Sequence, residues 1–268
     1  PFTAAVGHAP AKEWVTKLDD WFWDIMPATT MQRVVTVGND SFGNPKLGCP
    51  IHGQEIYTVN AYYPWIVDCE AMPYRITCPI GGETYPSNDY AAGDLTAGPY
   101  ADDGRGCLIE GKRYYFLGLY AHYAYNTVLQ PAIKSFGDAY LATDDLRYAH
   151  KAAICLLKEA YEYPDSDDRK ERTYIPGYGK GSGMITDVVW SSMALLESAQ
   201  CYDQIIPAID GDSELLRFAR ERIPKIQTMA DLKVYIETHL FRSGIQAVMD
   251  RAIQPNIGWG AEAIASLA

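Results

Sequence analysis

Two short turns hold the residues of this chain that are best suited to bind a metal ion. The segment CPIHG at residues 49–53 places a thiol and an imidazole three residues apart. The segment CPIGG at residues 78–82 repeats the pattern with glycine at the position of the second ligand. Cysteine sulfur and histidine nitrogen are the usual ligands of structural zinc, and such turns aim two of them at one ion.

These ligand types predict a structural zinc ion held by Cys49, His52 and Cys78. A tetrahedral site needs a fourth ligand, for which Cys69 and Cys107 are the candidates. A site closed by four protein ligands would be structural rather than catalytic. Two other interpretations stay open, namely a disulfide between Cys49 and Cys78 in a secreted protein, and free buried thiols.

The composition of the chain excludes some classes of partner. Its 268 residues carry a formal net charge of −11, and the 23 lysines and arginines are scattered along the sequence. A nucleic-acid-binding protein needs a basic field, so we expect no nucleic-acid partner. No run of about 18 apolar residues occurs, so we expect no membrane-spanning helix.

The first part of the chain is expected to be largely irregular. Apolar residues at helical spacing predict a helix over residues 10–24, which Pro27 ends. From there to about Lys112, glycine, proline, asparagine and aspartate interrupt every periodic pattern. A long irregular stretch in a compact domain is usually functional, and a metal ion or disulfide would stabilise it.

The remainder of the chain predicts long helices arranged as hairpins. Pro131 is expected to kink or split the first of them, and Thr143-Asp144-Asp145 is expected to cap the second. The predicted helices cover residues 114–140, 145–163, 184–209, 213–222 and 229–251. Helical hairpins stacked in sequence close into an (α/α) toroid with an open cleft.

We therefore expect a mainly α fold, an incomplete (α/α) toroid of stacked helical hairpins with a long irregular loop region near the N-terminus. One domain is expected over 1–268, with the helix and loop region in 1–112 and the helical hairpins in 113–268. The sequence stops inside an apolar helical pattern, so the domain is expected to belong to a longer multidomain chain.

One segment resembles a known family. The stretch SFGDAYLATDDLRYAHKAAICLLKEAYEYP, residues 135–164, looks like the toroid of heparinase II/III-type polysaccharide lyases. The resemblance covers roughly Tyr114 to the end of the chain. It implies a secreted or periplasmic lyase that cleaves a uronic-acid-containing, acidic polysaccharide by β-elimination.

The resemblance also implies catalytic groups. β-Elimination needs a group that neutralises the C5 carboxylate, a base that removes the adjacent proton and an acid that protonates the leaving oxygen. Asn256 lies in the nearest match to the family's motif for the first task, although Ile257 follows it where the family often has histidine. His122, Tyr123 and Tyr178 are the candidates for base and acid, and the alternative for His122 is an ordinary core histidine.

Substrate binding would need local cations and aromatic rings, because the net charge opposes an anionic polymer. The expected substrate-binding residues are Arg33, Asn88, Asp89, Arg105, Asn126, Lys180 and Trp259. Two other functions stay open. One is an (α/α)-toroid glycoside hydrolase, which would use two of Asp24, Asp89 and Asp187. The other is a non-catalytic helical module that binds carbohydrate or protein.

Overall fold

The computed structural model describes residues 11–27, 47–61, 63–166 and 188–252. It is mainly helical, as the sequence predicts, and short strands occur only in its N-terminal half. The described residues form two compact units. A helical unit comprises described residues of 11–24, 125–165 and 188–252, and a loop-rich unit comprises those of 25–124 together with residue 166. That residues 1–268 form a single domain stays a prediction.

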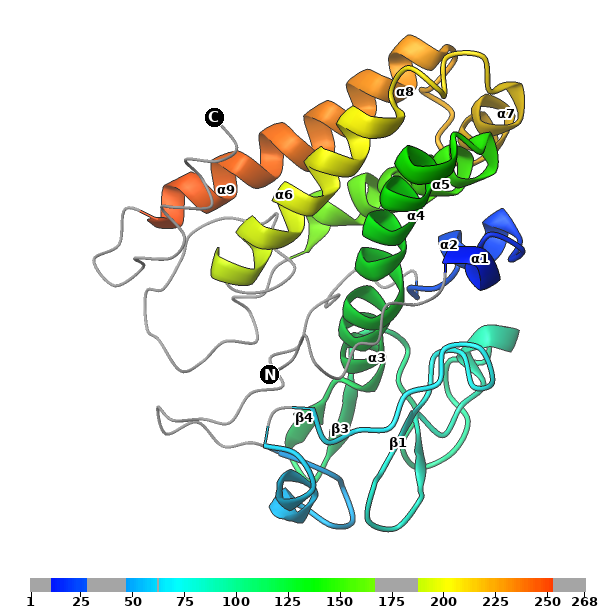
Figure 1. The fold of residues 1–268 in the computed structure, drawn as a ribbon. Helices are drawn as coiled ribbons and strands as arrows, with labels where there is room; N and C mark the ends of the chain where they lie inside the picture. Colours follow the sequence, from blue (N-terminus) through cyan, green and yellow to red (C-terminus); the bar gives the residue numbers. More distant parts are fainter. Residues whose placement is uncertain (1–10, 28–46, 62, 167–187, 253–268) are drawn as a thin grey trace. The chain divides into compact units, whose positions relative to one another are not determined.

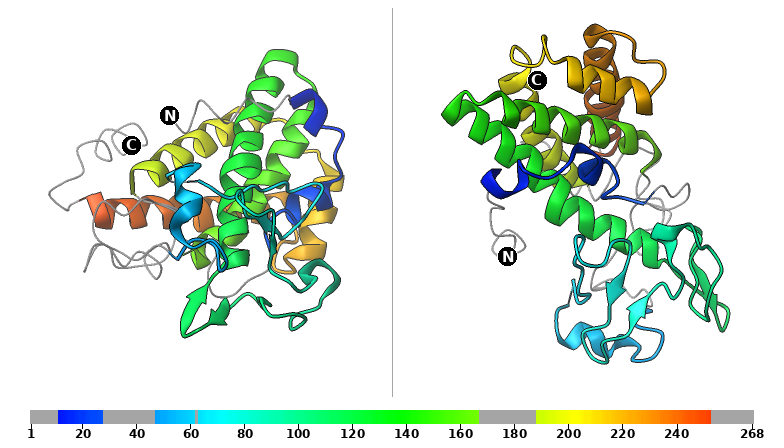
Figure 2. Two further views of the ribbon diagram at one scale, coloured as in Figure 1. Left: turned by 90° about the horizontal axis from the view of Figure 1, so that it is seen from below. Right: turned by 90° about the vertical axis from the view of Figure 1, so that its right-hand side faces the viewer.

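The helical unit is built from helices that pack along one another (Figures 1 and 2). Helix α4 lies against both α5 and α6, and α6 lies against α9. The helices of this unit are α1 (Ala11–Trp14), α2 (Asp19–Trp23), α4 (Gln130–Thr143), α5 (Leu146–Glu162), α6 (Val188–Ile205), α7 (Ser213–Arg222), α8 (Met229–Ile236) and α9 (Ser243–Ala252).

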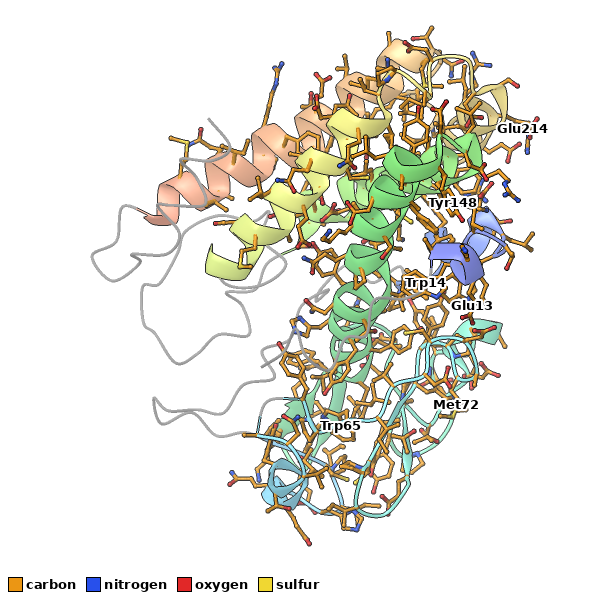
Figure 3. The ribbon with its side chains drawn as sticks, viewed as in Figure 1. Glu13, Trp14, Trp65, Met72, Tyr148 and Glu214 are labelled. Carbon is orange, nitrogen blue, oxygen red and sulfur yellow. The ribbon has the colours of Figure 1, made fainter. Side chains whose placement is uncertain are left out.

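The α4–α5 hairpin forms as its capping residues predict. Asp144 adopts the left-handed conformation that ends α4, and the Asp145 side chain accepts a hydrogen bond from the backbone N–H of Arg147 at the start of α5. Phe136 of α4 packs edge-on against Phe22 and near Tyr148 of α5, which Figure 3 labels. The apolar faces predicted from the helical spacing therefore form the core of this unit.

Two π-helical segments interrupt the predicted long helices. The first, η4 (Tyr125–Leu129), directly precedes α4, whose first turn contains Pro131. Proline has no N–H and its ring crowds the carbonyl four residues earlier, so a wider turn before it relieves the clash. The second, η6 (Glu237–Arg242), separates α8 from α9.

The single helix predicted over residues 10–24 is wrong, because two short helices, α1 and α2, replace it. The hydroxyl of Thr16 donates a hydrogen bond to the carbonyl of Glu13 and so takes an acceptor from the helical ladder. Leu18 then adopts an extended conformation and is 76% exposed. Of the apolar residues at helical spacing, Ile25 is buried as expected, whereas this leucine is not.

The loop-rich unit contains little regular structure, as the sequence predicts. Its elements are η2 (Gln54–Thr58), β1 (Ile76–Thr77), β2 (Thr84–Tyr85), η3 (Tyr90–Ala92), β3 (Cys107–Ile109), β4 (Lys112–Tyr114) and α3 (Phe116–Ala124). Strands β1 and β2 pair antiparallel, with Ile76 opposite Tyr85, and β3 and β4 pair separately. Aromatic rings fill the space between the loops, such as Trp65 edge-on to Tyr85 (Figure 3).

A buried carboxylate joins two parts of this unit. One oxygen of Asp102 accepts hydrogen bonds from the backbone N–H groups of Gly104 and Gly106, and the other accepts from Leu117 at the start of α3. These bonds satisfy donors that the loop and the helix end would otherwise leave without partners. Across the described residues, no helix has both the length and the apolar composition needed to cross a bilayer.

Candidate metal centre

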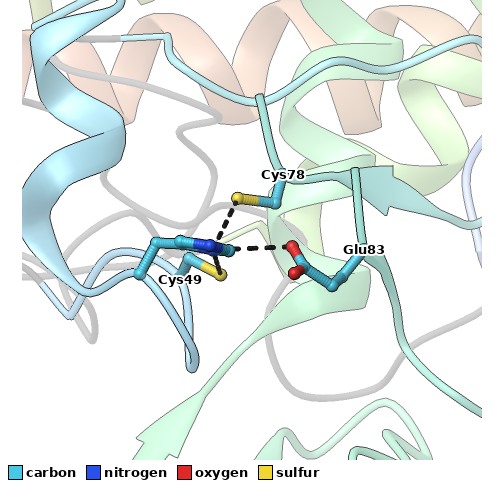
Figure 4. Close-up of side chains that lie close together, drawn as sticks. Cys49, Cys78 and Glu83 are labelled. Carbon is cyan, nitrogen blue, oxygen red and sulfur yellow. Dashed lines mark hydrogen bonds and ion pairs between the residues drawn. The ribbon is translucent and has the colours of Figure 1, made fainter. Parts of the chain in front are cut away.

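Four side chains of the loop-rich unit converge on one point. They are Cys49, His52, Cys78 and Glu83, whose ligand atoms all lie within 4.8 Å of one another. The Nδ1 atom of His52 is central, at 3.6 Å from the sulfur of Cys49, 3.5 Å from the sulfur of Cys78 and 3.5 Å from Oε2 of Glu83 (Figure 4). This cluster could hold a metal ion.

The two turns place these ligands by backbone geometry. In the first, the N–H of Cys49 donates to the carbonyl of Gly53 at 3.0 Å, and the N–H of Gly53 donates back at 2.7 Å. In the second, the N–H of Gly82 donates to the carbonyl of Cys78, and the N–H of Cys78 donates to the carbonyl of Glu83. Gly53 and Gly82 have φ values of 55° and 79°, which glycine adopts without strain.

Glu83 supplies the ligand that the second turn lacks. At Gly81, a Cβ atom would lie 2.3 Å from both Oε1 of Glu83 and Cε1 of His52. Any side chain at position 81 would therefore occupy the space that the carboxylate and the imidazole now share. Gly81 stands where the first turn has its histidine ligand. Because it has no side chain, it leaves room for the carboxylate of Glu83, two residues later.

The sulfur of Cys49 is surrounded by hydrogen-bond donors. The Tyr85 hydroxyl lies 3.3 Å away and the backbone N–H of Ile51 lies 3.4 Å away. Burial raises the pKa of the Cys49 thiol, but hydrogen bonds from Tyr85 and from the backbone of His52 and Ile51 outweigh it, so the net pKa is below the ordinary value. This environment favours the thiolate, which is the form that binds metals.

The pKa values of Cys78 and His52 are raised, in contrast to that of Cys49. Burial raises the pKa of Cys78, and the neighbouring Cys49 adds to that shift. The hydrogen bond with Cys49 raises the pKa of His52, with the charge of Glu83 as a further contribution. Two thiol groups and a carboxylate thus lie close to one imidazole, an arrangement that a cation would stabilise.

The predicted fourth ligand is wrong, because Glu83 occupies the place expected for Cys69 or Cys107. Tyr120 is a neighbour of the Cys69 thiol, and the sulfur of Cys107 lies 3.9 Å from the carbonyl of Pro99. The disulfide interpretation is not supported either, since Cys49 and Cys78 are both free thiols. Sequence reasoning missed Glu83, although it is the acidic residue closest to the second turn.

The predicted base candidates lie elsewhere in the loop-rich unit. His122 and Tyr123 are adjacent on α3, with side chains that are almost completely buried. The ring of Tyr63 stacks parallel to His122 at 5.9 Å and lies edge-on to Tyr123 at 5.6 Å. The Tyr123 hydroxyl accepts a hydrogen bond from the backbone N–H of Trp65, and burial raises its pKa.

Other predicted binding residues have local structural contacts. Asn88 is buried, and its side-chain amide bridges the backbone of Asp94 and Asp102. Asp89 is exposed and caps η3 through the N–H of Ala92. Arg105 is exposed, and Asn126 lies in η4 of the helical unit.

Five predicted site residues lie outside the described part of the chain: Arg33, Tyr178, Lys180, Asn256 and Trp259. Asp187, considered for the hydrolase, also lies outside it. Their roles stay predictions. Comparison of the chain with protein-family models, with curated proteins and with solved structures found no match.

Proposed function

We propose that Cys49, His52, Cys78 and Glu83 bind one zinc ion that stabilises the loop-rich unit. The observation that carries this proposal is the set of distances around Nδ1 of His52, which are 3.5 to 3.6 Å to three different ligand atoms. With Zn–S bonds of about 2.3 Å and Zn–N bonds of about 2.0–2.1 Å, neighbouring ligands of a tetrahedral ion lie about 3.4–3.8 Å apart.

The carboxylate of Glu83 gives a second, independent reason. Its Oε2 atom is buried and faces the cluster, and it has no hydrogen-bond partner among the described residues. Its contact with Nδ1 of His52, at 3.5 Å, is too long for a strong hydrogen bond, so a metal ion would lower the cost of burying this oxygen. The ligand residues therefore fit a bound cation better than they fit a set of independent hydrogen bonds.

The ligand types favour zinc over other metals. Two thiolates with one imidazole select zinc or another soft-to-borderline metal, whereas magnesium and calcium take oxygen ligands. Zinc would supply a fixed cross-link between two turns that are 26 residues apart, measured from His52 to Cys78. The unit otherwise depends on two small antiparallel pairs of strands and one helix.

Metal analysis of the purified full chain tests the proposal. We expect one zinc per chain in the wild type and none in the double variant Cys49→Ser, Cys78→Ser. The matched control is Cys107→Ser, which alters a buried thiol outside the cluster and is expected to keep one zinc per chain. Equal metal content in all three proteins would disprove the assignment.

A second candidate function is the β-elimination of a uronic-acid-containing polysaccharide, in a secreted or periplasmic toroid enzyme. One observation favours it beyond the family resemblance. The segment that carries the resemblance folds as the α4–α5 hairpin with its acidic turn capped as expected. The stacked hairpins of the helical unit would then belong to an incomplete (α/α) toroid.

His122 is the better candidate for the base of this reaction. A phenolate at Tyr123 is disfavoured because burial raises the pKa of its hydroxyl, which already accepts the N–H of Trp65. A neutral imidazole can accept a proton, and Tyr63 would hold the ring of His122 in place.

Ultraviolet absorbance during incubation with uronate polysaccharides tests this second function, because elimination leaves a conjugated double bond. We expect the absorbance to rise with one polymer in the wild type and to be lost in His122→Ala. Tyr63→Phe, which keeps the ring, should retain the activity. A flat trace for folded wild type with every polymer would reject the lyase for those substrates.

A further inference from the structure

We propose that Glu83 is an exchangeable ligand and that the metal centre accepts a small carboxylate-like anion in its place. This inference rests on the proposed zinc site and concerns how that site is filled. Three of the four ligands are fixed by the fold, while the fourth is held much more loosely.

Cys49, His52 and Cys78 form the fixed part of the site. The two sulfur-bearing residues are 0% and 1% exposed, and each begins a turn that is closed by backbone hydrogen bonds. His52 lies inside the first of these turns, between the two hydrogen-bonded ends at Cys49 and Gly53. The turns therefore fix the backbone that carries these three ligands.

Glu83 differs from these three in exposure and in its contacts. Its side chain is 32% exposed, compared with 23% for His52. Other carboxylates of the chain are held firmly: Asp102 by three backbone N–H groups, and Glu159 by the hydroxyls of Tyr125 and Ser198. Oε2 of Glu83 accepts no hydrogen bond within the described residues, so rotating it towards water would lose only its 3.5 Å contact with Nδ1 of His52.

Gly81 leaves space for an incoming ligand. A Cβ at this position would lie 2.3 Å from Oε1 and 2.5 Å from Oε2 of Glu83. The place beside the carboxylate is therefore bordered by backbone instead of a side chain. If Glu83 turned outward, a ligand of carboxylate size could occupy the vacated position.

The resulting ligand set is one that zinc uses when it keeps a position for exchange. Closed structural sites have four firmly held protein ligands, whereas sites with two cysteines and one histidine can bind water or substrate at the fourth position. A carboxylate bound through one oxygen is also the ligand here with the least preference for a soft metal. We infer that the fourth position can exchange while the other three ligands keep the unit folded.

Cobalt-substituted full-length protein gives a direct test, because the visible absorption of Co²⁺ reports its ligands. Titration with sodium azide, which binds as a small monodentate anion, should change the wild-type spectrum in a saturable way. If Glu83 holds the position in about nine-tenths of the molecules, Glu83→Ala should respond at about tenfold lower azide concentration. Acetate should compete with azide for the same position.

Glu83→Cys is the matched closed-site variant. A third thiolate should hold the fourth position, and its spectrum should not change with azide. Persistence of the azide response in Glu83→Cys would overturn the proposal, because azide would then add without replacing residue 83. The proposal would also be overturned if azide changed neither the wild-type spectrum nor the Glu83→Ala spectrum at any concentration.

The experiment separates this inference from the proposed metal site. Failure of the protein to bind one Co²⁺ per chain would reject the site itself. Stoichiometric binding with a spectrum that azide does not change would leave the site in place and reject only the exchange. Circular dichroism of each variant confirms that the fold is intact before the titration.

Discussion

The sulfur of Cys78 lies 3.5 Å from Nδ1 of His52, although 26 residues separate them in the chain. The contact brings together two turns of nearly identical sequence, one carrying two ligand types and the other carrying one. Both turns are closed by their own backbone hydrogen bonds, so the backbone geometry of each depends on neighbouring residues. The centre therefore combines ligands from two turns that are each closed locally.

Removal of the metal should destabilise the loop-rich unit. If zinc binds only the folded state, free zinc at one thousand times its dissociation constant contributes about 4 kcal/mol to the free energy of unfolding. We expect a chelator to lower the unfolding midpoint of the wild type. Urea unfolding followed by tryptophan fluorescence measures the difference, since Trp65 lies in this unit.

The chelator should have little effect on Cys49→Ser, Cys78→Ser, which has no zinc to lose. The control Cys107→Ser should respond to the chelator as the wild type does. A wild type whose unfolding is the same with and without chelator would contradict a stabilising metal ion.

Gly81→Ala should weaken metal binding without altering either cysteine. The added methyl group would lie 2.3 Å from Glu83 and His52, and something must move to admit it. Competition with a chromophoric chelator should show a lower zinc affinity. Gly211→Ala is the matched control, because a Cβ there meets nothing within 4 Å, and unchanged affinity in both variants would contradict the crowding argument.

A charged histidine in the helical unit should make stability depend on alkaline pH. His150 lies between Asp212, at 2.6 Å from Nδ1, and Asp19, at 3.1 Å from Nε2. Burial lowers the pKa of His150, but hydrogen bonds and charges from the two carboxylates outweigh it and raise the pKa from 6.5 to about 9. The imidazolium connects the start of α2 to the residue that caps α7.

Because the folded pKa is raised, this contribution is fully present below pH 6.5 and is lost as the pH rises through about 9. The shift corresponds to about 3 kcal/mol. The stability difference between wild type and His150→Gln, from urea unfolding at a series of pH values, should fall across this window. A constant difference for His150→Gln across this window would contradict the bridge.

Glu159 should also make stability fall as the pH rises, because it is buried and its hydrogen-bond partners among the described residues are hydroxyl groups. Burial raises its pKa from 4.5 to about 7, although hydrogen bonds from Tyr125 and Ser198, both at 2.7 Å, lower it in part. The folded state therefore binds a proton more tightly than the unfolded state. Stability should decrease as the pH rises from 4.5 through 7, by about 3 kcal/mol.

Glu159→Gln carries no titrating group and should gain stability relative to the wild type across that interval. Urea unfolding of both proteins between pH 4.5 and 8 measures the gain. A gain that does not vary with pH would show that Glu159 does not titrate in this range.

The sequence by itself determined the features that depend on neighbouring residues. Helix α7 begins and ends where predicted, because Asp212 caps it and the local apolar spacing is unambiguous. The helical character of the C-terminal half and the irregular character of residues 47–112 were predicted for the same reason. Three of the four proposed ligands were identified because the conformation of a CPxHG-type turn depends only on neighbouring residues.

Only the tertiary structure decided which residue completes the centre and where long helices break. Glu83 reaches the cluster because Gly81 leaves space and strand β2 fixes the chain beside it, neither of which is visible as a spacing of ligands. By residue type, Cys69 and Cys107 are more usual zinc ligands than Glu83, but each packs against other residues. Residue types set what a side chain can bind, whereas the distances that permit binding depend on contacts between segments far apart in the chain.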